Sequence, residues 1–77
     1  MTTLDQLQPG QHGTIEEISN EHPAIERLME MGLVPGTPVH VVRFAPLGDP
    51  IEIVARGYNL SLRRAEASAI VLQLDES

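Results

Sequence analysis

Alternating apolar and polar positions predict that most of this chain forms β-strands. Regular runs rich in β-branched residues lie late in the sequence, and a less regular run lies near its start. In that early run the apolar residues Ile15 and Ile18 stand three positions apart, so the alternation is imperfect. The predicted strands cover 12–19, 38–45, 51–56, 58–62 and 69–74.

A helical pattern separates the first two strands. Apolar side chains recur at spacings of three and four within 21–31, which predicts one short amphipathic helix over these residues; they are Ile25, Leu28 and Met29. Gly32 follows, as expected of the left-handed residue that ends a helix, and Leu33 is then placed to fold back onto the last turn. Shorter helical turns are expected over 4–7 and 63–68.

The segment 46–50, "PLGDP", predicts the turn of a β-hairpin between 38–45 and 51–56. A shift of one residue would oppose Arg43 to an isoleucine, so we expect the register that pairs it with an acid. That register places His40, Val42 and Phe44 on the buried face. Its pairs are Phe44 with Ile51, Arg43 with Glu52 and Val42 with Ile53.

Short strands and tight turns in 77 residues predict a mainly β fold. A flat sheet would leave its edge strands exposed, whereas a strongly bent antiparallel barrel of about five strands hides them. Proline and glycine would set the corners of that barrel. We therefore expect a single domain over 1–77, a small antiparallel barrel with one short helix.

Composition narrows the possible functions. Eleven acidic residues against five arginines and no lysine give a formal net charge of −6, which disfavours nucleic-acid binding because that needs a basic surface. The chain has no cysteine, which excludes disulfides and thiolate metal sites. No signal peptide and no membrane-inserted segment are predicted. Its serines lie in no nucleophile motif, and no phosphate-binding glycine loop is present, so we do not expect an enzyme.

The three histidines are scattered along the sequence and show no ligand spacing. We expect that the protein requires no cofactor, and we interpret His40 as a residue of the barrel wall. The best exposed set is His22 with Glu21 and Glu26, which could hold Fe²⁺ or Zn²⁺ weakly. This set supports an alternative function, a divalent-metal-binding domain for sensing or delivery.

The chain resembles the ferrous iron transport protein A (FeoA) family from about Leu4 to Leu74, and four sequence blocks carry the resemblance. They are "LMEMGLVPGTPV", "RFAPLGDPIEI", "RGYNLSLRRAEA" and "AIVLQL". The resemblance implies an SH3-like barrel in a cytoplasmic accessory protein of bacterial ferrous iron uptake. It also implies a partner, the membrane transporter FeoB, which has a cytoplasmic G-protein domain. The same barrel is similar to the C-terminal domain of iron-dependent metalloregulators.

An accessory role implies a contact surface and leaves self-association open. We expect that surface at the end of the helix and at the hairpin turn, where Leu47 is an apolar residue that a core does not need. A rigid turn alone would also explain the residues of "APLGDP". The predicted contact residues are Met31, Leu33, Leu47, Asp49 and Arg64.

Overall fold

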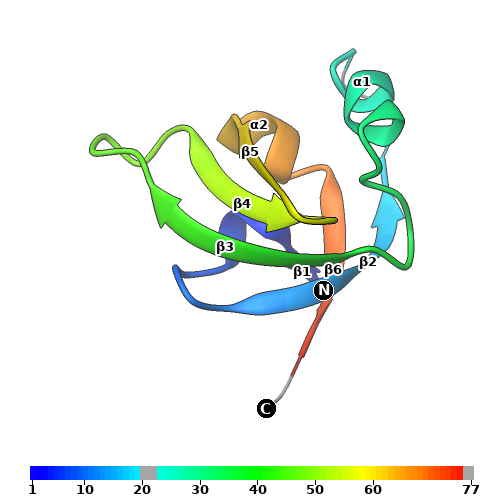
Figure 1. Ribbon diagram of the computed structural model, residues 1–77, viewed down its shortest axis with the longest axis horizontal. Helices are drawn as coiled ribbons and strands as arrows, with labels where there is room; N and C mark the ends of the chain where they lie inside the picture. The colour runs from blue at the N-terminus through cyan, green and yellow to red at the C-terminus, as the bar shows by residue number, and fades with distance from the viewer. Residues whose placement is uncertain (20–22, 76–77) are drawn as a thin grey trace.

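A computed structural model describes residues 1–19 and 23–75, and it is mainly β (Figure 1). Its strands form one six-stranded antiparallel sheet in the order β1-β6-β2-β3-β4-β5. The sheet curls around a core, as expected of a small barrel (Figure 1). The elements are β1 (Thr2–Thr3), η1 (Leu4–Gln6), β2 (His12–Ile18), α1 (Ile25–Glu30), β3 (Pro38–Phe44), β4 (Ile51–Ala55), β5 (Tyr58–Leu62), α2 (Arg64–Ala67) and β6 (Ile70–Leu74).

The core draws side chains from nearly every element, including η1, α1 and α2. Burial alternates cleanly along β4, where Ile51, Ile53 and Ala55 are buried between half-buried neighbours. The mainly β class and the five predicted strands are confirmed. The sheet has one strand more than expected, because the two residues of β1 pair with β6 without any apolar pattern of their own.

A β-bulge in β3 changes which residues of this strand are buried. The register moves from Val41 opposite Ile53 to Arg43 opposite Glu52, so Val42 is an extra residue in β3. The predicted pairs Phe44–Ile51 and Arg43–Glu52 are confirmed. The pair Val42–Ile53 is wrong, and so is the burial of Val42 and His40: Val42 is 45% exposed and His40 is exposed. Val39 and Val41 fill the core instead.

A second bulge explains the imperfect pattern of β2. Its register with β6 moves between Ile15, opposite Leu72, and Glu17, opposite Val71. One extra residue lets two side chains three positions apart face the same side of a strand. Ile15 is accordingly buried, and Ile18 packs partly buried against the same core.

The Arg43–Glu52 pair lies on the outer face of the hairpin, where the Arg43 guanidinium donates to the Glu52 carboxylate. This hydrogen bond lowers the pKa of Glu52 and raises that of Arg43. Both groups are open to water, which screens their attraction. The pair therefore favours the register of the hairpin more than it stabilises the fold.

Helix α1 is shorter than the predicted 21–31, of which Glu21 and His22 lie outside the described residues. Its end is as expected. Gly32 has φ +100°, its N–H donates to Met29 O at 3.0 Å, and the Leu33 N–H donates to Leu28 O at 3.1 Å. This is a Schellman ending, which turns Leu33 back into the core.

Candidate functional site: the β3–β4 tip

The connection between β3 and β4, residues 45–50, forms a projecting tip at one end of the molecule (Figure 1). The Gly48 N–H donates to Ala45 O at 2.7 Å, and the Ala45 N–H donates to Pro50 O at 2.9 Å. Pro46 and Gly48 suit the second and fourth positions of such a turn. Leu47 stands between them with 97% of its surface exposed, so the turn presents one large apolar side chain to solvent.

Arg64, the first residue of α2, fastens the tip to the body of the barrel. Its Nε donates to Gly48 O at 2.5 Å, and its Nη1 donates to Asp5 O at 3.1 Å. The guanidinium carbon lies 4.7 Å from the centroid of the Phe44 ring, a cation–π distance. One side chain thus joins the tip, η1 and β3.

Asp49 adds a second hydrogen bond between the tip and Arg64. Its Oδ1 accepts a hydrogen bond from the Arg64 backbone N–H at 3.1 Å, at the start of α2. That N–H has no partner within the helix, so a side-chain acceptor there is favourable. Two bonds between Arg64 and residues 48–49 therefore hold the backbone next to Leu47.

The structure brings three of the five predicted contact residues together, namely Leu47, Asp49 and Arg64. Met31 directly follows α1, and Figure 1 shows α1 on the opposite side of the view from the tip, so Met31 belongs to a separate surface. Leu33 was wrong as a contact residue, because its side chain is 0% exposed. The helix ending that buries it leaves the neighbouring Met31 45% exposed.

Beside the tip lies an opening of about 320 Å³, lined by residues of the tip, β5, α1 and the start of α2. Glu66 is buried there, accepts the Arg63 backbone N–H at 2.8 Å and lies 3.7 Å from the Arg27 guanidinium. Within the opening, the Glu66 carboxylate therefore faces one basic side chain, that of Arg27. Its lining residues are Arg27, Asp49, Pro50, Ser61, Arg63 and Glu66.

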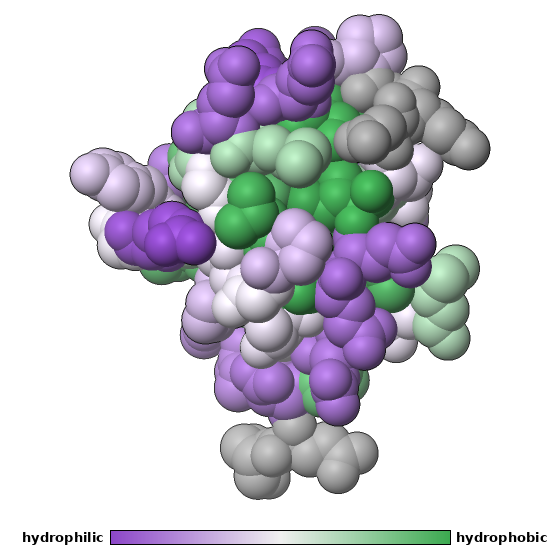
Figure 2. Space-filling model, turned by 90° about the vertical axis from the view of Figure 1, so that its right-hand side faces the viewer, coloured by the Kyte–Doolittle hydropathy of each residue, from purple (hydrophilic) through white to green (hydrophobic). Residues whose placement is uncertain are grey.

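A second surface surrounds α1. Figure 2 views this side of the molecule and shows apolar atoms gathered in the upper half of the face, between hydrophilic groups. Met29 and Met31 are exposed at the end of α1. Glu26, the described member of the predicted metal set, is also exposed on α1, while Glu21 and His22 lie outside the described residues.

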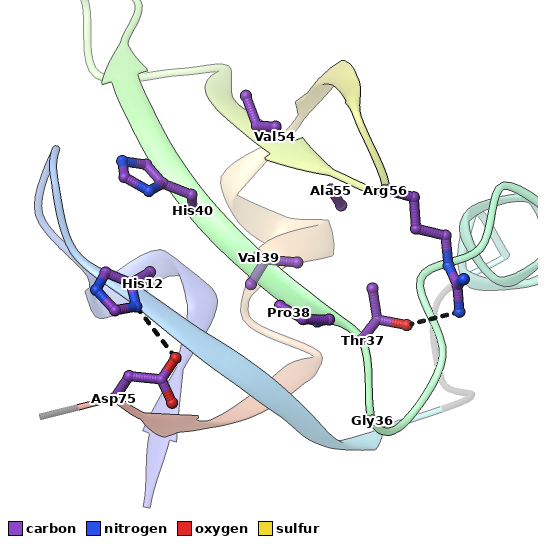
Figure 3. Close-up of a pocket in the computed structure, with 10 residues that line it drawn as sticks. All are labelled: His12, Gly36, Thr37, Pro38, Val39, His40, Val54, Ala55, Arg56 and Asp75. Atoms are coloured by element: carbon purple, nitrogen blue, oxygen red, sulfur yellow. Dashed lines mark hydrogen bonds and ion pairs between the residues drawn. The ribbon is translucent and has the colours of Figure 1, made fainter.

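A groove of about 630 Å³ on the β2–β3 side brings together residues that are far apart in the sequence (Figure 3). His12 and His40 lie directly opposite each other in the register of β2 and β3. Their rings are stacked, with centroids 5.8 Å apart, and His12 Nδ1 lies 3.1 Å from Asp75 Oδ2. No local spacing signals this pair; only the correct pairing of the two strands would have found it.

Over residues 1–19 and 23–75, no three His, Cys, Asp or Glu side chains converge into a preformed metal cage. Within the same part of the chain, no helix has the length and apolar character needed to cross a membrane.

The chain matches the model of the FeoA domain over residues 2–74. A Porphyromonas gingivalis protein, described as a fusion of Fe(2+) transport protein A and the Fe(2+) transporter FeoB, is 36% identical over 74 residues. That match covers 96% of this chain but only 9% of the relative, so the chain spans a small part of the relative's length.

Two solved structures share the architecture. The FeoA protein from Chlorobium tepidum has a TM-score of 0.87 and 40% identity, over 97% of this chain and 74% of its own. Stenotrophomonas maltophilia FeoA complexed with zinc, described as an SH3 domain protein, has a TM-score of 0.84 and 27% identity, over 95% and 91%. The expected SH3-like barrel is confirmed. Because the family model and the similar structures both cover almost the whole chain, this protein belongs to the FeoA family.

Proposed function

We propose that this protein is a cytoplasmic accessory protein of ferrous iron uptake, and that it acts by binding the FeoB transporter. The observation that carries this proposal is the P. gingivalis relative, in which a domain similar to this chain is fused to FeoB. Fusion keeps two domains at a high effective concentration, which is useful where they work in contact. A separate chain must achieve the same contact through a binding surface.

The β3–β4 tip is the surface that best fits such a contact. Leu47 is an apolar side chain with no role in the core, and apolar anchors that fill a partner's pocket supply much of the energy of an interface. Arg64 and Asp49 hold the backbone beside it. A loop that is already ordered loses less conformational entropy on binding. The net charge of −6 further favours encounter with a basic partner surface.

Replacing Leu47 by aspartate tests the site. An anchor residue contributes about 2 kcal/mol or more, so the affinity for the cytoplasmic part of FeoB should fall by roughly 30-fold or more. Leu47 is almost fully exposed, and stability should change by no more than about 0.5 kcal/mol. Isothermal titration calorimetry, with and without guanine nucleotide, measures the binding, and thermal unfolding checks the fold.

Met31→Asp is the matched control, because it makes the same change at the exposed end of α1. We expect Met31→Asp to bind like the wild type. If Met31→Asp loses binding and Leu47→Asp keeps it, the contact site is the α1 surface and not the tip. If the wild-type chain binds FeoB in no nucleotide state, the proposed function itself is wrong.

A further inference from the structure

The paired histidines of β2 and β3 are placed as the two arms of a chelate. Directly opposite residues of antiparallel strands have Cβ atoms about 5 Å apart and project from the same face of the sheet. His12 and His40 hold such positions, and their ring planes are within 15° of parallel. Figure 3 shows both rings at the same end of the groove, extending in the same direction.

Asp75 decides which nitrogen of His12 is free. A carboxylate only accepts hydrogen bonds, so the neutral ring must carry its proton on Nδ1, which lies 3.1 Å from Asp75 Oδ2. The lone pair is then on Nε2. A carboxylate that fixes the tautomer of a histidine in this way is the usual second partner of a metal-binding imidazole. The Asp75 backbone N–H also donates to His12 O at 3.1 Å, which places the carboxylate beside this ring.

The positively charged side chain that lines the groove lies away from the histidines, so it does not repel a metal ion bound between them. Arg56 lines the other end of the groove, where its Nε donates to Gly32 O at 3.0 Å and its Nη2 to Thr37 Oγ1 at 3.3 Å. Figure 3 shows the Arg56 side chain extending away from both histidines. Asp75 therefore supplies the charge next to the imidazoles, and its sign favours a cation.

We propose that His12 and His40 together bind one divalent transition-metal ion of the Zn²⁺ or Fe²⁺ type, with Asp75 as the positioning residue of His12. Two imidazole nitrogens on one tetrahedral ion stand about 3.4 Å apart, given metal–nitrogen distances near 2.05 Å. Because neither ring is buried, both can tilt toward each other from their present stacking. Water completes the coordination. This site goes beyond the contact with FeoB and does not depend on it.

The test is titration of the full chain with Zn²⁺ alone and, without oxygen, with Fe²⁺ alone. Calorimetry should show one ion per chain. His12→Gln and His40→Gln should each weaken binding by about 100-fold or more, the upper end of what loss of an outer partner costs. Asp75→Asn should weaken it by about 10- to 100-fold and leave the stoichiometry unchanged. Zn²⁺ should also raise the melting temperature of the wild type but not of His40→Gln.

His22→Gln is the control, because it removes the third histidine of the chain and should leave the affinity unchanged. In NMR spectra, the ring signals of His12 and His40 should shift along one binding curve. The proposal is overturned if neither ion binds, or if only His22→Gln abolishes binding. It is also overturned if the ion bridges two chains, seen as half an ion per chain with a dimer in size-exclusion chromatography.

Discussion

Arg64→Ala is expected to lower the free energy of unfolding by about 2–4 kcal/mol. The substitution removes a charged donor from two backbone oxygens, Gly48 O and Asp5 O, and each such bond contributes about 1.5–3 kcal/mol. It also removes the cation–π contact with Phe44, about 0.5–1 kcal/mol. These losses overlap and do not simply add. A domain of this size has only about 4–12 kcal/mol in total, so urea unfolding should resolve the effect clearly.

Arg63→Ala is the matched control, because it makes the same change in charge at an exposed neighbouring position. We expect its stability to stay within about 0.5 kcal/mol of the wild type. Arg64→Lys should fall between the two, since an ammonium keeps the charge but lacks the planar fork that reaches both oxygens. If Arg64→Ala and Arg63→Ala unfold at the same urea concentration, the guanidinium does not hold the tip.

Gly32→Ala is expected to cost about 2–5 kcal/mol, from two separate causes. At φ +100° an L-residue is strained by about 1–2 kcal/mol. The new Cβ would also lie 2.7 Å from Arg56 Cδ and 2.9 Å from its Nε, so Arg56 must move. Its hydrogen bonds to Gly32 O and Thr37 Oγ1 would then be lost, at about 0.5–1.5 kcal/mol each. The same urea experiment measures this change.

Gly36 separates the two causes. It has φ +94°, but a Cβ there would meet nothing within 4 Å, so Gly36→Ala should show the backbone cost alone. In an Arg56→Ala background, Gly32→Ala should fall to the same value, because the side chain that it displaces is gone. An unchanged cost of Gly32→Ala in that background would show that Arg56 plays no part.

The strands were predictable because each carries its own β-branched run or apolar–polar alternation between turn residues. The predicted 58–62 coincides with β5. β1 was not predictable, since Thr2–Thr3 becomes a strand only through its pairing with β6. The bulge in β3 left no trace either: Val41 and Val42 are equally apolar, so the pattern cannot tell which one is the extra residue. In β2 a trace was visible in the interval between Ile15 and Ile18.

The sequence predicted some residues of the candidate sites and missed others. Leu47 stood out in the sequence as an apolar residue in a turn, and its exposure agrees with that interpretation. The sequence led to two predictions for Leu33, that it packs back onto α1 and that it contacts a partner, and one side chain cannot do both. The structure shows the packing onto α1, because a Schellman ending favours a contact between Leu33 and the last turn of the helix. His12 and His40 meet only through the sheet register, which no local pattern encodes.

The bulge at Val42 also bears on insertions and deletions in this hairpin. On either side of Val42 the inward positions are already in phase with β4, Val41 opposite Ile53 and Phe44 opposite Ile51. Removing Val42 would therefore leave every one of these pairs intact and would change only the bend of the strand. A relative with one residue fewer in β3 can keep the same core and carry its tip in another direction. Chain length at this single position is thus a way to re-aim residues 45–50 without altering the residues that hold them.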